Sequence, residues 1–196
     1  MITGLLVAAG HSTRMGTLKQ LMPFGDVSIL EQVVRALTTS KVQEVVVVLG
    51  FRSDDIRIRL APWPVKVVLN PDPDGDMLSS IHCGIKAISE DHAVLIALGD
   101  QPLISSNIIN ILVEEYEKEP TGMILPVYNG KRGHPMIIAP SFRKLLLSHT
   151  DGGLKALRDR YEDQVRTIQV NTDTILIDLD YYHEYEQAIK RLAKGI

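Results

Sequence analysis

The segment from Leu5 to Gln20 contains the residues best suited to bind phosphate; it reads LLVAAGHSTRMGTLKQ. An apolar run leads into Gly10, and the small residues that follow let backbone N–H groups approach an anion. Ser12 adds a hydroxyl, and Arg14 and Lys19 add two cationic donors. The segment therefore predicts a phosphate-binding loop. The alternative is that its glycines only turn the chain and its cations face solvent.

The spacing of this loop differs from the two common nucleotide-binding fingerprints. Gly16 is followed by Thr17 and Leu18, and the lysine comes only at position 19. The segment is therefore neither the G-x-G-x-x-G dinucleotide motif nor the G-x-x-x-x-G-K-[ST] loop.

Carboxylates follow two apolar runs and are candidates for holding Mg²⁺. Asp100 ends the run LIALGD, and an acid at the carboxyl end of a central strand lies at the ligand crevice of an α/β sheet. Asp178 and Asp180 end the short apolar run in LIDLDYY, and either is a candidate for a second metal carboxylate. The alternative for each is an acidic residue at a turn or a helix start.

Polar side chains also occur at two further junctions between predicted secondary-structure elements. Asn70 precedes a proline-rich turn and a helix near Ser79 and Ser80, whose hydroxyls and free N–H groups are expected to meet a nucleotide. Simple helix capping by Ser79 is the alternative. His134, between Gly133 and Pro135, is either a ligand contact or a structural residue.

Short apolar runs alternating with helical periodicity must position these residues. Strands are predicted at 2–8, 45–49, 65–69, 93–98, 123–127, 134–139 and 165–170, with helices near 29–37, 78–88, 108–116, 154–161 and 181–193. The Asn129-Gly130 pair favours a tight hairpin, so some strands are antiparallel. The pattern predicts an α/β three-layer sandwich with a mostly parallel, mixed sheet that binds ligands at the carboxyl ends of its strands.

Composition narrows the classes of partner. The chain has 196 residues and a net charge of −3, which provides no broad positive field for nucleic acid or anionic membranes. Its single cysteine, Cys83, cannot form an intramolecular disulfide. The N-terminal apolar run from Leu5 to Ala9 is too short to span a bilayer and lacks the basic flank expected of a signal peptide. We expect a cytoplasmic protein with small-molecule partners and no nucleic acid or membrane partner.

The order of the motifs resembles the MobA-like nucleotidyltransferases, most closely their molybdenum cofactor cytidylyltransferase branch. The resemblance covers nearly the whole chain and is most specific in the first loop, where L-x-A-A-G-x-S-x-R-M-G is followed by Lys-Gln-Leu-x-P. The matching positions there are Leu6, Ala8, Ala9, Gly10, Ser12, Arg14, Met15, Gly16, Lys19, Gln20, Leu21 and Pro23.

The resemblance implies a nucleotide-diphospho-sugar transferase (Rossmann-like) fold over a single domain, residues 1–196. It implies transfer of CMP from CTP to the phosphate of molybdopterin, release of pyrophosphate, a Mg²⁺ cofactor and a recipient molybdoenzyme as a further partner. The residues that it assigns to catalysis are Arg14, Lys19 and Asp100; those assigned to binding are Ala8, Ala9, Gly10, Ser12, Arg14, Lys19, Asn70, Ser79, Ser80 and His134; those assigned to the metal are Asp100 and Asp180. A sugar-phosphate or polyol-phosphate acceptor and a non-catalytic molybdenum cofactor carrier are the alternatives.

Three positions depart from the family pattern. Asp76 stands before Met77 where the family often has glycine, which adds a negative charge near the predicted pocket. The late motif D-x-D-T-P-E-D is met only by its two aspartates, and the usual acidic-Gly-Ala-Arg stretch reads DGGLK from Asp151. These departures fall at the second metal ligand and in part of the acceptor site.

Overall fold

The fold comes from a computed structural model that describes residues 1–10, 15, 17–50, 53–72, 75–150 and 152–194. Ser12 and Arg14, two of the predicted phosphate-loop residues, lie outside the described residues. The remaining predicted site residues are all within them.

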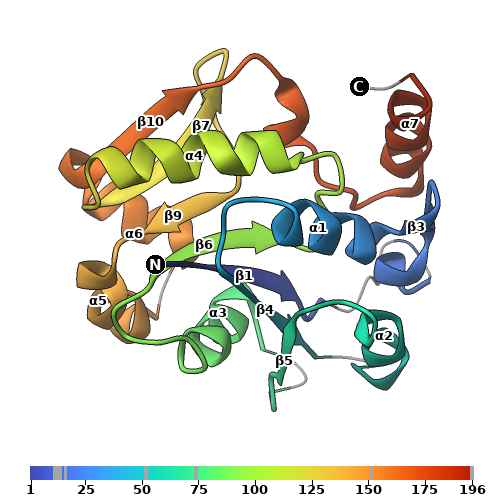
Figure 1. Cartoon of the computed structure of the whole chain (residues 1–196), viewed down its shortest axis with the longest axis horizontal. Helices are drawn as coiled ribbons and strands as arrows, with labels where there is room; N and C mark the ends of the chain where they lie inside the picture. The colour runs from blue at the N-terminus through green and yellow to red at the C-terminus, as the bar shows by residue number, and fades with distance from the viewer. Residues whose placement is uncertain (11–14, 16, 51–52, 73–74, 151, 195–196) are drawn as a thin grey trace.

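A mixed sheet runs through the centre of the molecule (Figure 1). Its described strands follow the order β10-β7-β9-β6-β1-β4-β5, with β8 paired to β7. Their bounds are Ile2–Ala8 (β1), Glu44–Leu49 (β4), Lys66–Leu69 (β5), Ala93–Leu98 (β6), Met123–Tyr128 (β7), Lys131–Arg132 (β8), Met136–Ile138 (β9) and Val165–Gln169 (β10). Every pair among them is parallel except those that β8 and β9 make. The predicted mixed, mostly parallel sheet is confirmed.

The central strands are apolar because helices cover both of their faces. All six residues of β6 are buried, and so are five of the six in β4. Residues that alternate along β6 enter different cores: Leu95 and Ala97 lie in one cluster, Val94 and Ile96 in the other. This two-sided burial explains why the strands read as continuous apolar runs.

Two helical layers complete the sandwich. One core contains apolar side chains of α1 (Ile29–Thr38), α2 (Ser53–Leu60) and α4 (Ser106–Lys118). The other contains those of α3 (Met77–Ile85), α5 (Arg143–Ser148) and α6 (Gly153–Arg160). Figure 1 shows α1 and α4 in front of the sheet. The predicted three-layer arrangement is confirmed, whereas α5 and the short β2–β3 hairpin (Pro23–Phe24 and Val27–Ser28) were not predicted.

The Asn129-Gly130 turn has the geometry expected from its sequence. Both residues have positive φ, 47° and 77°, and they join Tyr128 of β7 directly to Lys131 of β8. A two-residue hairpin loop with two positive φ angles is a type I′ turn, which glycine and asparagine adopt most easily. The chain then returns through β9, which runs antiparallel between β6 and β7.

The end of the chain crosses back to its beginning. After β10, a 3₁₀ turn, η5 (Asp173–Leu176), leads into α7 (Tyr182–Leu192), which Figure 1 places beside β3. Leu179 and Ala188 form a third apolar cluster with Phe24 and Ile29, and the Tyr185 hydroxyl donates to the Pro23 carbonyl at 2.8 Å. The N-terminal hairpin and the C-terminal helix therefore support one another.

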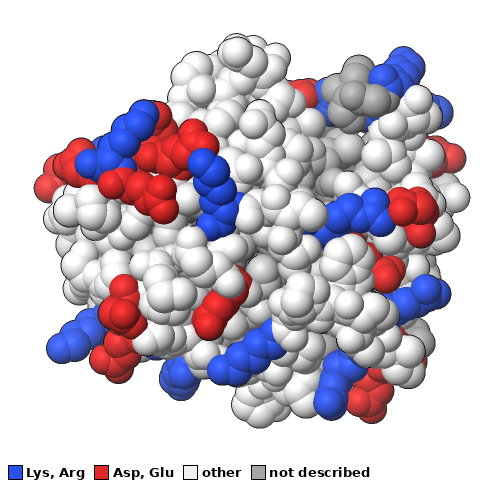
Figure 2. Space-filling view, in the orientation of Figure 1, with Lys and Arg blue, Asp and Glu red and all other residues white. Residues whose placement is uncertain are grey.

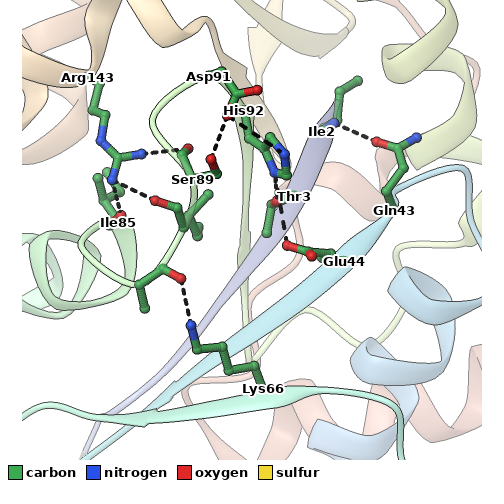
Figure 3. Close-up of polar contacts among 12 residues, drawn as sticks. Ile2, Thr3, Gln43, Glu44, Lys66, Ile85, Ser89, Asp91, His92 and Arg143 are labelled. Carbon is green, nitrogen blue, oxygen red and sulfur yellow. Dashed lines mark hydrogen bonds and ion pairs between the residues drawn. The ribbon is translucent and has the colours of Figure 1, made fainter.

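Polar contacts tie the amino ends of the strands to one another and fix the far end of α3 (Figure 3). Thr3 Oγ1 lies 2.9 Å from Nδ1 of the buried His92, which joins β1 to the start of β6. The Arg143 guanidinium donates to the carbonyls of Ile85, Ile88 and Ser89 at 2.5, 2.8 and 3.0 Å. These contacts lie at the amino ends of the strands, opposite the carboxyl ends where the ligand crevice is predicted.

The face shown in Figure 2 carries Lys and Arg side chains intermixed with Asp and Glu. Across the part of the chain that the structure describes, no helix has the length and apolar character needed to cross a bilayer.

Candidate active site

Three predicted site residues from distant parts of the chain meet at the carboxyl end of β6. Lys19 lies in the 3₁₀ turn η2 (Lys19–Leu21), Asp100 follows β6, and Asp180 precedes α7. The Lys19 ammonium donates to Asp100 Oδ2 at 2.9 Å and to Asp180 Oδ1 at 3.0 Å. Lys19 is only 8% exposed, so its aliphatic stem is packed and its ammonium is directed at the two carboxylates. We refer to these three residues as the lysine–carboxylate cluster.

The charges of the cluster favour a protonated lysine. Burial by itself would lower the pKa of Lys19, but Asp100, and then Asp180, more than offset this, so that its pKa is raised. The lysine therefore remains an ammonium ion at neutral pH. One positive charge between two carboxylates still leaves the cluster with a net negative charge.

The cluster suits a hard divalent cation that is shared with substrate. Asp100 Oδ1 is buried and has no hydrogen-bond partner among the described residues, so one ligand oxygen is left over. Within those residues there is no group of three or more His, Cys, Asp or Glu side chains that could hold a metal. Mg²⁺ commonly takes one or two carboxylates and completes its shell with water and substrate phosphates, which matches this ligand set.

A small pocket lies beside the cluster, between the end of β1 and the start of α3. It measures about 140 Å³ and includes Ala9, Gly10, Ser80 and Asp100 among its lining residues. The structure thus brings four predicted residues together. It does not bring Ala8 to the pocket, because that side chain is 4% exposed in the core, where the close approach of Gly99 encloses it.

The start of α3 corrects the expectation for Ser79. Asp76 is the N-cap of this helix, and its carboxylate accepts from the Ser79 N–H at 2.8 Å. Capping by Ser79 is therefore wrong, and this N–H is not free for a nucleotide. Asn70 is buried and its amide donates to the hydroxyls of Ser79 and Ser80 at 3.1 and 3.0 Å, so these three residues brace the loop against the helix.

His134 lies in a close contact between β9 and the η5 turn. A Cβ on the preceding Gly133 would meet the Ile175 carbonyl oxygen at 2.3 Å, and the His134 N–H donates to that same oxygen at 3.1 Å. Desolvation lowers the pKa of His134, although Asp100 and a hydrogen bond to the Ile96 carbonyl oppose this. Its Nδ1 is buried and without a partner among the described residues. The imidazole is therefore neutral at physiological pH and cannot serve as a cation for phosphate.

Two residues that support the cluster were not predicted as site residues. Gln101, 2% exposed, donates from its side-chain amide to Asp178 Oδ1 at 2.6 Å. Glu184, in the first turn of α7, accepts from the Asp180 N–H at 2.7 Å. Gln101 directly follows Asp100, and this position next to a predicted metal ligand is the feature of the sequence that could have identified it as a site residue.

Residues 4–165 of the chain match the MobA-like NTP transferase domain. The chain belongs to this family. Among the relatives of this MobA-like transferase, the molybdenum cofactor cytidylyltransferase of Escherichia coli is 24% identical over 192 residues, which cover 95% of each chain. The nicotine blue oxidoreductase of Paenarthrobacter nicotinovorans is 30% identical over 159 residues and 77% of each chain.

Solved structures support the fold of this MobA-like transferase. Rv0371c of Mycobacterium tuberculosis is 24% identical, superposes with a TM-score of 0.87 and covers 96% of this chain, which in turn covers 97% of Rv0371c. The same protein solved with manganese gives a TM-score of 0.82 at 22% identity, with 96% and 98% of the two chains covered. This likeness confirms the nucleotide-diphospho-sugar transferase type of fold.

Proposed function

We propose that this MobA-like transferase moves CMP from CTP to the phosphate of molybdopterin, with Mg²⁺, and releases pyrophosphate. The observation that carries the proposal is the lysine–carboxylate cluster, Lys19 with Asp100 and Asp180, at the carboxyl end of β6. The choice of CTP and molybdopterin is supported by the E. coli relative of that name. In this proposal residues 1–196 act as one cytoplasmic domain that passes its product to a recipient molybdoenzyme.

Charge neutralisation is the main task in this reaction. A nucleoside triphosphate carries about −4 and a phosphate monoester about −2, so their approach is opposed by repulsion. When bound, Mg²⁺ supplies positive charge to the triphosphate oxygens. Asp100 and Asp180 would hold it, with the Lys19 ammonium freed to contact phosphate oxygens. Backbone N–H groups near Ala9 and Gly10, with Ser12 and Arg14, are the further proposed phosphate donors.

The bond changes need no strong base from the protein. The second pKa of a phosphate monoester is about 6, so the acceptor is mostly ionised at neutral pH. One of its oxygens attacks the α-phosphorus of CTP, and the bond from this phosphorus to the bridging oxygen of the pyrophosphate group breaks. Lys19 and Arg14 would stabilise the charge that develops on the leaving group. His134 would lie near the acceptor as a neutral hydrogen-bonding group.

Thermal unfolding of the purified protein tests the nucleotide half of the proposal. CTP, GTP, ATP, UTP and NADPH are each compared with and without Mg²⁺. A ligand at about 100 times its dissociation constant adds about 2.7 kcal/mol to the unfolding free energy, or about 5–10 °C for a chain of this size. We expect a shift that is selective for CTP and dependent on Mg²⁺.

Pyrophosphate release then tests the acceptor. Turnover with CTP and molybdopterin, and none with sugar or polyol phosphates, is the expected result; the reverse would favour the sugar or polyol alternative. A shift with NADPH alone would favour a redox role, in line with the oxidoreductase relative. Binding of molybdopterin with no response to any nucleotide would favour the carrier role.

A further inference from the structure

We infer that Gln101 and Asp178 form a clasp that positions Asp180 opposite Asp100, and that Asp178 is a positioning residue rather than a metal ligand. The inference rests on the proposed function, because it concerns how the chain builds its proposed metal site. It gives a role to two residues flanking the lysine–carboxylate cluster that do not belong to it.

The clasp joins the segment after β6 to the segment before α7, and a backbone hydrogen bond beside it joins the same two segments. The Gln101 side-chain amide donates to Asp178 Oδ1 at 2.6 Å, and the Leu179 N–H donates to the Asp100 carbonyl at 2.9 Å. Gln101 is 2% exposed, so the surrounding protein restricts its side chain to this orientation. Two residues of each segment are thereby fixed to each other immediately beside the proposed metal carboxylates.

Asp180 is fixed from its other side as well. Leu179 is fully buried in the cluster with Phe24 and Ala188, and the Asp180 N–H donates to Glu184 at 2.7 Å. The backbone on both sides of Asp180 is therefore anchored, which leaves its carboxylate directed at Lys19. A backbone held this way keeps the carboxylate in place when a cation replaces the Lys19 ammonium.

Electrostatic repulsion between the two segments gives the clasp a function. The segments carry three aspartates, Asp100, Asp178 and Asp180, and the Lys19 ammonium contacts Asp100 and Asp180. Like charges on the two segments oppose their approach. The Gln101 amide is the donor that satisfies the third carboxylate without adding a charge. Because Asp178 already accepts from this buried amide, we assign it to holding the loop.

Mn²⁺ binding to the purified protein tests the clasp, with Mn²⁺ alone as the probe and loss of the free-ion electron paramagnetic resonance signal as the readout. Asp178→Asn and Asp178→Leu form a matched pair, since both remove the charge but only asparagine keeps an oxygen that can accept from Gln101. Gln101→Met removes the donor at similar size. Thermal unfolding of each variant establishes that it is folded.

We expect Asp178→Asn to retain Mn²⁺ affinity within about threefold, and Asp178→Leu and Gln101→Met each to weaken it by about 10-fold or more. Equal losses in Asp178→Asn and Asp178→Leu would overturn the inference and make Asp178 a ligand. Unchanged affinity in Gln101→Met would also overturn it, and this result stands even if Asp178→Leu does not fold. Failure of the unmodified protein to bind Mn²⁺ would instead refute the metal site of the proposed function, and the clasp with it.

Discussion

Lys19 has two competing sets of partners, the carboxylates that it contacts in the structure and the phosphates that we propose for it. We predict that Lys19→Ala lowers turnover about 100-fold, because the side chain stabilises charge that develops on the leaving group. The same variant should bind Mn²⁺ at least as tightly as the unmodified protein, since a competing cation has been removed from Asp100 and Asp180. Steady-state pyrophosphate release and Mn²⁺ titration measure the two effects.

The control for this variant is Lys86→Ala, which removes an exposed lysine at the opposite end of α3 from the pocket. It should leave both quantities unchanged. Full turnover in Lys19→Ala would remove Lys19 from the proposed mechanism.

At the scale of single residues, the sequence identified the charged members of the site but not what holds them. Lys19, Asp100 and Asp180 stand in or after recognisable motifs, and the structure brings them together. The hydrogen bond from Gln101 to Asp178 spans 77 positions and leaves no periodic trace in the sequence. Helix capping by Ser79 was wrong because the N-cap is Asp76, three residues before Ser79, and the helix begins at Met77.

Among the elements, α3 depends on a cation from another helix for its C-terminal end. Arg143 donates to the carbonyl of Ile85, the last residue of α3, and to those of Ile88 and Ser89 in the turn that follows (Figure 3). The end of a helix has unpaired acceptors and the negative end of the helix dipole, so a cation is stabilising there. We predict that Arg143→Ala lowers the free energy of unfolding by about 1–3 kcal/mol. Denaturant unfolding measures this loss. Lys144→Ala, at the adjacent and exposed position, should change it by less than about 0.5 kcal/mol; similar losses in both variants would contradict the capping role.

The elements that could be predicted are those whose burial imposes a pattern. The three parallel strands at the centre, β1, β4 and β6, are apolar on both faces, and helices α1 and α4 show one apolar side. Helix α5 has six residues, too few to display a helical period, and each strand of the β2–β3 hairpin has two. Their positions depend on contacts with the rest of the molecule, which a local pattern does not contain.

For the molecule as a whole, α7 links the site to the packing of both ends of the described chain. Ala188 is 1% exposed and packs with Phe24, Ile29 and Leu179, the residue before Asp180. We predict that Ala188→Asp lowers the unfolding free energy by about 3 kcal/mol or more and weakens Mn²⁺ binding, because a buried charge separates α7 from the hairpin. The control, Gln187→Asp, introduces the same residue at an exposed position of the same helix. Denaturant unfolding and Mn²⁺ titration should show no loss in the control; an equally stable Ala188→Asp would contradict this packing role.

The contact between Lys19 and Asp180 also bears on the order in which parts of the molecule fold. It joins residues 161 positions apart, whereas β1 and β4 pair residues separated by about 41 positions. Closing the longer loop costs more chain entropy, so the sheet can assemble while its reactive edge is still incomplete. A newly made molecule would thus form its central sheet before Lys19 contacts Asp180. During that interval it would be compact yet unable to bind the cation that we propose for its active site.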